Sequence, residues 1–376
     1  MPIYKMKGSK DGLQKYRIRI NYHDMSGNAR QIDRVAYGLD NAKELEMRLN
    51  RDIKKEAPAR RLTLQKLYDE YVETKKHEVR ESSLDKSKRI LQRYILPELS
   101  EYQLNKLTLP ILQKWKLGIA KTELAQQTKQ SIYSKFHALL NYAVKMEYLS
   151  SNPLNKIGNF KDNLSLQKEM LYYTPEEFIK YLAAARKNAE RAEKNSNMFE
   201  WHYYVFFAIA FYTGLRKGEI HGLQWDDISG DYLSVKRSIT QKLGNGDRET
   251  PPKNRSSIRT LQIPQPLKDV LTEHYERCKA APEFNYKCKI CGIFKSLRDS
   301  TLEKRNQQFA ESAGVKKIRI HDFRHSHASL LANEGINIQE IARRLGHSKI
   351  EITWNTYSHL YPREEERAIK ILDKIV

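Results

Sequence analysis

The sequence has no long hydrophobic run, only three cysteines and a deficit of acidic side chains. No apolar segment approaches the length of a membrane span, and residues 1–10, MPIYKMKGSK, lack the apolar core of a signal peptide. These absences argue against a membrane-bound or exported protein, and we expect the chain to work in the cytoplasm. Its 376 residues, 40% of them hydrophobic, suffice for two or three domains with real cores.

Basic residues outnumber acidic ones along the whole chain. The totals are 67 lysines and arginines against 46 aspartates and glutamates, for a net charge of +21. Residues 1–61 carry 15 basic against 8 acidic side chains, residues 62–155 carry 15 against 10, and the remainder carries 37 against 28. A chain that is basic in every part predicts a polyanionic partner that every part touches, and nucleic acid is the expected one.

Residues 1–61 carry the pattern of a small sheet backed by one helix. In the segment YRIRINY, apolar and aromatic side chains alternate with polar ones, as in a half-buried strand. A further strand is predicted near 30–37 and a helix near 40–55. The candidate DNA contacts on the basic face of the sheet are Arg17, Arg19 and Arg30. The alternative is an ordinary solvated basic face.

Residues 62–155 are predicted to be helical. Apolar residues recur at helical spacing in two stripes. The stripes are Leu64, Leu67, Tyr68 and Tyr71, and then Ile132, Phe136, Leu139, Leu140, Ala143 and Val144. Asn152 and Pro153 end this unit, and residues 156–171 read as a linker. A capping box of Thr174 and Glu177, with a proline at the first helical position, then marks the start of a domain at 172–376.

Six residues suited to phosphate chemistry follow one another in the C-terminal part of the chain. They are Arg216, Lys253, His321, Arg324, His347 and Tyr357. The local signals place them on or beside helix ends, where polar side chains can converge on an anion. Residues 321–334 read as a helix, and Arg216 begins another just past Gly214.

The signals around His347 predict two further helices. Asn337 with Glu340 would open the first as a capping box, and Gly346 would end it. Ser348 with Glu351 would open the second, which carries Tyr357 two turns in. His347 is therefore expected in a tight loop between two helices.

The chain resembles the tyrosine recombinases, and more narrowly the integrases of phages and integrative elements. The resemblance rests on four segments within residues 172–362. They are TGLRKGEIHGLQWDDI at 213–228, PPKNRSSIRTLQIP at 251–264, HDFRHSHASLLANEGINIQEIARRLGHS at 321–348 and TWNTYSHLYP at 353–362. The resemblance implies a multidomain, mainly α fold. Its parts would be an arm-type DNA-binding domain (1–61, a three-stranded sheet plus a helix), a helical, SAM-like core-binding domain (62–155) and a mixed, mainly α catalytic domain with a small β-sheet.

The resemblance also implies roles for the six residues. Tyr357 would attack a DNA phosphate, and Arg216 and Arg324 would stabilise the negative charge that gathers on the non-bridging oxygens. His321 would act as a base and His347 as a hydrogen-bond donor to the phosphate. Lys253 would protonate the departing 5′ oxygen. Because a phosphotyrosine conserves the bond energy, neither ATP, a metal ion nor any other cofactor is expected.

Some assignments have competitors. Arg255 lies two residues from Lys253, and Tyr361 lies four residues from Tyr357. We prefer Lys253 because the family's lysine precedes a serine-containing turn, and Tyr357 because of its offset from His347 and the histidine that follows it.

Glu219 matches the acidic residue that the family has beside the first arginine. We expect it to position Arg216, although it could instead pair with Lys217 or Lys236. His325 and His327 are predicted to be surface or packing histidines rather than metal ligands.

All three cysteines fall between 278 and 291. His274 and Cys278 are four residues apart on a predicted helix, and Cys288 and Cys291 form a C-x-x-C pair, so four zinc ligands are conceivable. The family requires no such site. The interpretation preferred at this point is that these are reduced thiols around a surface loop, with no metal bound.

The expected function is integration and excision of a mobile element through a covalent 3′-phosphotyrosine and a Holliday junction. The alternatives are resolution of chromosome dimers and DNA binding without catalysis. The resemblance implies a homotetramer on core and arm sites of DNA, with an excisionase or DNA-bending protein as a further partner. The apolar stripe at the C-terminus would dock on a neighbouring protomer or fold back on its own domain. It consists of Ile369, Leu372, Ile375 and Val376.

Overall fold

The computed structural model describes residues 3–23, 29–56, 62–161, 170–242, 246–250 and 257–361, together with Ile369 and Leu372. The chain begins with an antiparallel three-stranded sheet. Its strands are β1 (Ile3–Lys10), β2 (Leu13–His23) and β3 (Ala29–Tyr37), in the order β1-β2-β3. Helix α1 (Leu39–Glu56) packs on one face, where Ile18, Ile20 and Ala42 form a small core. The alternation in β2 is thus confirmed, and it leaves the arginines on the other face.

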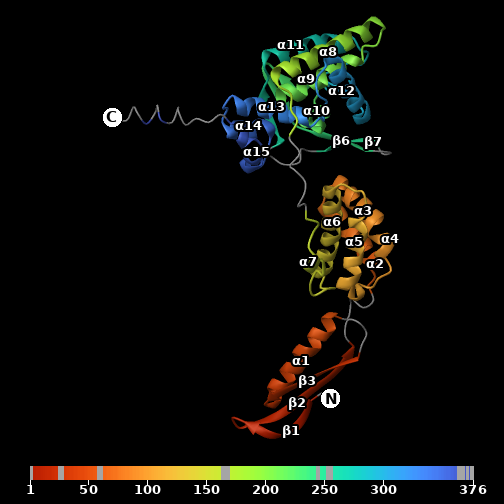
Figure 1. Cartoon of the computed structure of the whole chain (residues 1–376), viewed down its shortest axis with the longest axis vertical. Coiled ribbons are helices and arrows are strands. Elements are labelled where there is room, and N and C mark those ends of the chain that lie inside the picture. Colours follow the sequence, from red (N-terminus) through yellow and green to blue (C-terminus); the bar gives the residue numbers. More distant parts are fainter. Residues whose placement is uncertain are drawn as a thin grey trace. The chain divides into compact units, whose positions relative to one another are not determined.

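A bundle of helices forms the next part of the chain (Figure 1). Its elements are α2 (Leu64–Glu78), α3 (Glu81–Tyr94), α4 (Leu96–Leu99), η2 (Leu104–Lys106), α5 (Leu109–Ala120), α6 (Gln126–Lys145) and α7 (Leu154–Ile157). The two predicted apolar stripes meet in one core around Trp115 and Phe136, so the helical prediction is confirmed. Phe160 is buried in this same core, and Lys116 donates from Nζ to the carbonyl oxygen of Gly158 at 2.9 Å. The predicted linker, 156–171, therefore begins inside packed structure.

The chain divides into two compact units, Met1–Leu166 and Gln167–Val376. The second unit is mainly helical, with α8 (Pro175–Lys194), α9 (Glu200–Thr213), α10 (Lys217–Gly222), η3 (Trp225–Asp227), α11 (Gln265–Lys279), α12 (Asp299–Ala313), α13 (Asp322–Asn333), α14 (Ile338–Leu345), α15 (Ile350–Tyr357) and η5 (Ser358–Leu360). Two small antiparallel sheets accompany them, β4-β5-β8 and β6-β7. Their strands are β4 (Ile228–Ser229), β5 (Tyr232–Val235), β6 (Ser238–Lys242), β7 (Gly246–Thr250) and β8 (Arg259–Gln262).

Helix α9 is the centre of the second unit. Nearly every side chain along it is buried, as expected of a helix that is apolar on all sides. Helix α8 begins at the predicted capping box, in which Thr174 and Glu177 bond each other's backbone. Helices α13, α14 and α15 follow at one end of this unit (Figure 1). Within the described part of the chain, no helix is both long and apolar enough to cross a membrane.

Candidate active site

The turn from α9 to α10 places Arg216. Helix α9 ends at Gly214, whose φ of +64° lies in the left-handed region, and a Cβ there would come within 2.7 Å of the His327 ring. Only glycine fits this turn. Arg216 follows as the N-cap of α10, so its side chain leaves the helix start directly beside the turn.

Glu219 holds Arg216 in place. Its carboxylate accepts a hydrogen bond from Arg216 Nη1 at 2.9 Å and another from the Arg216 backbone N–H at 3.0 Å. The same carboxylate accepts from Nη2 of Arg259, also at 3.0 Å. Burial raises the pKa of Glu219, but the two arginines outweigh it and keep that pKa below its ordinary value. The alternative partners do not contact Glu219, because Lys217 pairs with Asp299 and Lys236 with Asp227.

Arg324 lies in the first turn of α13 and is only 3% exposed. It donates from Nη1 to the carbonyl oxygen of Gly214 at 2.8 Å and from Nη2 to that of Leu345 at 2.7 Å. Burial, and next the charge of Arg216, lower the pKa of Arg324 to about 9, so the guanidinium remains protonated at neutral pH.

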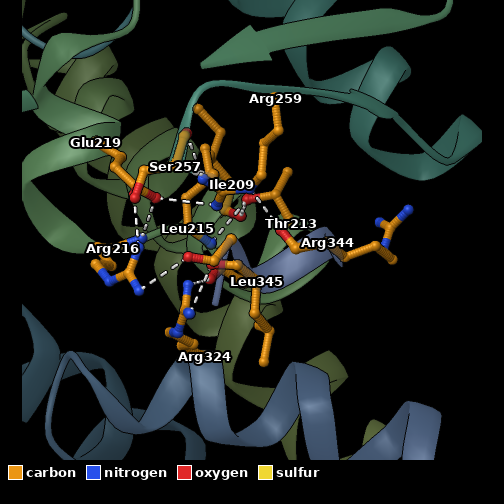
Figure 2. Close-up of polar contacts among 12 residues, drawn as sticks. Ile209, Thr213, Leu215, Arg216, Glu219, Ser257, Arg259, Arg324, Arg344 and Leu345 are labelled. Carbon is orange, nitrogen blue, oxygen red and sulfur yellow. Dashed lines mark hydrogen bonds and ion pairs between the residues drawn. The ribbon is translucent and has the colours of Figure 1, made fainter. Parts of the chain in front are cut away.

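The two guanidinium groups converge on the C-terminal end of α14 (Figure 2). Arg324 donates to the carbonyl of Leu345, and Arg216 donates from Nη2 to the next carbonyl, that of Gly346, at 3.4 Å. Carbonyls at a helix C-terminus carry partial negative charge, which offsets some of the repulsion between the two cations. One carboxylate and three carbonyl oxygens accept hydrogen bonds from this pair, and within the described part of the chain the remaining N–H groups of the two guanidiniums are free to bind an anion.

Tyr357 is the last residue of α15 and is 2% exposed. Its hydroxyl lies 2.6 Å from Nδ1 of His325, which is one turn into α13. Burial raises the pKa of Tyr357 well above the ordinary value for tyrosine, while Arg324 acts in the opposite direction. Burial also lowers the pKa of His325, so the imidazole is neutral and able to accept a proton.

His321 and His347 lie at the edges of the same site. The His321 ring packs edge-to-face on that of His325, with centroids 5.0 Å apart. His347 follows Gly346 in the turn between α14 and α15, and its Nδ1 lies 2.7 Å from the buried hydroxyl of Thr353. Partial burial and the nearby arginines lower the pKa of each histidine to about 4. Both are therefore neutral hydrogen-bonding groups at neutral pH.

The structure thus brings together five of the six predicted residues, together with Glu219. The sixth, Lys253, lies outside the described residues, as does its competitor Arg255. Tyr361 is not equivalent to Tyr357, since its hydroxyl donates to the carbonyl of Ile336 at 2.6 Å.

Two residues of the site were not predicted from the sequence. His325 was expected to be a surface or packing histidine, but it contacts the Tyr357 hydroxyl. The signal that could have found it is its place in HDFRH, one turn after His321. Arg259, buried at 8% exposure, donates to Glu219 and from Nε to the carbonyl of Arg344 at 2.6 Å, so it joins β8 to α14. Nothing in the sequence marked it.

The helix starts on either side of His347 differ in part from those predicted. Asn337 caps α14 by accepting from the backbone N–H of Gln339, but Glu340 pairs with Arg343 instead of completing a capping box. Helix α15 begins at Ile350 after Lys349, with no side-chain cap, so the predicted opening at Ser348 was wrong. The C-terminal stop at Gly346 is confirmed by its left-handed backbone.

The arginines of the N-terminal sheet have an acidic neighbour on β3. Arg17 forms an ion pair with Asp33, and Arg19 approaches the same carboxylate at 3.2 Å. The hydrogen bond from Arg17 lowers the pKa of Asp33 to about 2. The third predicted contact, Arg30, lies opposite Tyr22 across the β2–β3 ladder.

The architecture and the paired arginines around a buried tyrosine define a site-specific recombinase of the tyrosine type. Residues 177–364 match the family model described as the phage integrase family, and residues 63–116 match the model of a phage integrase N-terminal SAM-like domain. The chain belongs to the phage integrase family. The fold class and enzyme class predicted from the sequence are thereby confirmed.

Similar proteins agree with this placement. The ICEBs1 integrase of Bacillus subtilis (strain 168) is 27% identical over 99% of this chain and 100% of its own length. A tyrosine recombinase XerC-like protein of Caldanaerobacter subterraneus is 29% identical over 67% of each chain. Among solved structures, a fragment of the Tn1549 transposon integrase in complex with transposon right-end DNA matches with a TM-score of 0.66 at 18% identity, covering 84% of this chain and 99% of that one. A lambda integrase tetramer bound to a Holliday junction matches with a TM-score of 0.57 at 16% identity, covering 97% of each.

Proposed function

We propose that this recombinase integrates and excises a mobile element by cleaving and rejoining double-stranded DNA through Tyr357. The observation that carries the proposal is the convergence of Arg216 and Arg324 on one helix end beside the Tyr357 hydroxyl. Two guanidinium groups at one point suit the negative charge of a pentacoordinate phosphate, and a buried tyrosine beside them suits in-line attack.

In the proposed reaction the Tyr357 oxygen bonds to phosphorus while the bond from phosphorus to the 5′ oxygen breaks. The tyrosine proton passes to Nδ1 of His325, which already faces the hydroxyl. The departing 5′ oxygen takes a proton from Lys253, a role that rests on family resemblance alone. Rejoining reverses each transfer, with a new 5′ hydroxyl attacking the 3′-phosphotyrosine.

The histidine that receives the proton differs from the one expected from the sequence. His321 packs on His325 and is not paired with the Tyr357 hydroxyl among the described contacts. We therefore assign the base to His325. His321 and His347, both neutral, would hydrogen-bond the non-bridging oxygens.

The proposal also names the DNA sites and the proteins that act together with this chain. The Tn1549 and lambda structures contain DNA, and one lambda structure is a tetramer on a Holliday junction. These support DNA as the partner and a tetramer on it. The proposal adds that the DNA offers core and arm sites, that the tetramer consists of four copies of this chain and that it acts in the bacterial cytoplasm. An excisionase or DNA-bending protein would complete the assembly. Chromosome-dimer resolution is less favoured, because the match to the ICEBs1 integrase extends over the N-terminal sheet and not only over the recombinase core.

The test is a covalent trap. The DNA flanking the gene is sequenced to find the attachment site, and a nicked suicide duplex with that core site is incubated with the full chain. A protein–DNA adduct stable to denaturing electrophoresis is expected from the wild type and from Tyr361→Phe. Tyr357→Phe should form none while binding the same duplex with unchanged affinity. An adduct from Tyr357→Phe but not from Tyr361→Phe would overturn the assignment of the nucleophile.

A further inference from the structure

A second cluster of reactive side chains lies at the opposite end of α9 from Arg216. It is built from the start of α9, from α11 and from the loop before α12. Its members are His202, His274, Cys278, Cys288 and Cys291, and all five are buried, with exposures of 5% or less. About eleven residues of α9 separate it from the Gly214 turn, on the order of 17 Å at 1.5 Å per residue, so the cluster is not part of the active site.

Three of these residues already share one small volume. A nitrogen of His202, a nitrogen of His274 and the Cys278 sulfur all lie within 4.8 Å of one another. The two imidazole rings meet edge-to-face with centroids 4.7 Å apart, and Cys278 Sγ lies 3.4 Å from His274 Nε2. Ligand atoms around a tetrahedral zinc ion stand about 3.3–3.8 Å apart, so a small inward movement would close the site.

One ring nitrogen of His274 is buried without a partner among the described residues, and it is not the nitrogen nearest to Cys278. Its Nε2 lies 2.9 Å from the carbonyl oxygen of Ile290, while its Nδ1 is fully buried and has no hydrogen-bond partner. A buried nitrogen without a partner destabilises the fold, and a ligand that bonds it removes that cost. Donation of one N–H to a backbone carbonyl, with the other nitrogen left as a lone pair, is also how zinc-bound histidines are usually held.

The C-x-x-C pair lies in a tight hairpin that closes over the two histidines. Lys289 and Ile293 pair across the hairpin. Nδ1 of His202 lies 3.1 Å from the Gly292 nitrogen and 3.4 Å from the Ile290 carbonyl oxygen, and the tautomer that donates from Nδ1 to this carbonyl leaves Nε2 as a lone pair for a metal. Gly292 has a φ of +99°, and a Cβ there would lie 2.0 Å from the carbonyl oxygen of Lys295, so glycine is required. A C-x-x-C-G turn of this kind presents its two sulfurs from one short loop, as structural zinc sites do.

We propose that this cluster binds one structural zinc ion through His202, His274, Cys278 and one thiolate of the C-x-x-C pair. Two neutral imidazoles and two thiolates balance the double positive charge, so the complex is neutral and suits an apolar core. Each thiol loses its proton to solvent when the metal binds. The ion joins α9, α11 and the hairpin, and so braces the helix whose other end forms the Gly214 turn. His202 was absent from the ligand set considered from the sequence, because it lies 72 residues before His274.

The proposal is tested by the metal content of the full chain, purified on a tag without histidine and without chelator. Mass spectrometry of the metal should find about one zinc per chain in the wild type, and at least roughly tenfold less in His274→Gln and in Cys278→Ser. His221→Gln is the matched control, since His221 is a buried histidine of the same unit whose Nδ1 also lacks a partner. It should retain the zinc. Cys288→Ser and Cys291→Ser are compared in the same way, and the variant that loses the zinc identifies the fourth ligand.

Measurements on the wild type alone keep the proposal open to refutation if the variants fail to fold. Cobalt substituted for zinc should show thiolate-to-cobalt charge-transfer bands and the d–d bands of a tetrahedral ion. Zinc added to the metal-free chain should raise its melting temperature. A wild type with less than about a tenth of an equivalent of zinc, and no thermal response to added zinc, would show that these are reduced core thiols without a metal. Equal zinc in Cys278→Ser would also overturn the site. None of these results depends on whether Tyr357 forms an adduct.

Discussion

At the scale of single residues, the hydrogen bond between Tyr357 and His325 decides how the nucleophile is held. The phenol is buried and its pKa is raised, so in this state it keeps its proton and rests against a neutral imidazole. Attack requires that proton to leave, and the only side chain bonded to the hydroxyl in the described residues is His325. Substitution of His325 can distinguish two roles: a base that takes the proton of the Tyr357 hydroxyl, or a residue that only holds the hydroxyl in place.

His325→Phe is expected to lower the rate of adduct formation by about 10²-fold or more with DNA binding unchanged, the range typical of a general base. His325→Asn places an amide near the position of Nδ1 and can hold the hydroxyl without taking its proton. If His325 is the base, the asparagine variant stays as slow as the phenylalanine variant. Recovery of the rate in His325→Asn would mean that the histidine only positions Tyr357.

Glu219 is predicted to stabilise the fold as well as to orient Arg216. Glu219→Gln leaves the buried Arg259 facing backbone carbonyls without a counter-charge, which should lower the free energy of unfolding by about 2–4 kcal/mol. Glu249→Gln is the control, because Glu249 is exposed and meets Arg237 at 3.6 Å. Its effect should stay below about 1 kcal/mol. Denaturant titration of both variants measures the difference, and equal effects would contradict the prediction.

His327 should make the stability of the catalytic unit depend on pH. Burial, and next the charge of Arg344, lower the pKa of His327 to about 3, whereas an unfolded histidine titrates near 6.5. Between these values the unfolded chain binds a proton that the folded chain does not, so stability is complete above pH about 6.5 and is lost as the pH falls. The expected slope from this residue is about 1.4 kcal/mol per pH unit. His327→Gln should flatten the dependence between pH 6.5 and 4, and an unchanged slope would refute the assignment.

At the scale of elements, helix ends and one strand pair present the functional side chains. The α9–α10 turn presents Arg216, two residues after the left-handed Gly214, and the α14–α15 turn presents His347 directly after the left-handed Gly346. On the N-terminal sheet, β3 instead restrains the candidate DNA contacts of β2, since Asp33 holds Arg17 and Arg19. If the arginines bind DNA as predicted, a DNA phosphate competes with this carboxylate for them.

Asp33→Asn is therefore expected to strengthen binding to arm-site DNA by roughly three- to tenfold at low salt and to steepen its salt dependence, because two more cations become available to phosphate. Fluorescence anisotropy over a series of salt concentrations measures both quantities. Arg17→Gln should weaken the same binding, and a chain lacking residues 1–61 should lose arm binding while it still cleaves the core site. Unchanged affinity in Asp33→Asn would indicate that this face of the sheet does not contact DNA.

At the scale of the whole molecule, the two compact units carry separate cores, so DNA contacts outside the catalytic unit can be altered without unfolding the site. The apolar stripe at the C-terminus concerns contacts between whole chains. Ile369 and Leu372 are exposed, at 52% and 59%, while Ile375 and Val376 lie outside the described residues. Exposed apolar side chains favour docking on another protomer, although the stripe is too short to be stable alone.

Removing residues 366–376 should weaken assembly of the proposed four-subunit complex on DNA and change the rate of cleavage, with little effect on the melting temperature of the monomer. Native gel shifts with core-site duplexes and a thermal melt of the DNA-free chain measure the two effects. A large loss of monomer stability would instead place the tail on its own catalytic unit and end the proposed coupling between subunits.

The sequence alone determined the strand pattern of the N-terminal sheet and the helix boundaries near capping residues and glycines, and it supplied the catalytic candidates as predictions. These depend on local causes. The period-2 pattern around Ile18, the capping box at Thr174 and the stop at Gly346 act within a few residues, so they can be read from the chain.

Only the tertiary structure decided which side chains meet. Arg259 lies on a strand 40 residues after Glu219, and His202 lies 72 residues before His274, yet each pair shares one buried volume. His325 looked like any surface or packing histidine until the packing of α15 against α13 brought the Tyr357 hydroxyl to it. Such contacts depend on how whole helices pack, because burial and long-range pairing set their energies, and no local pattern encodes that arrangement.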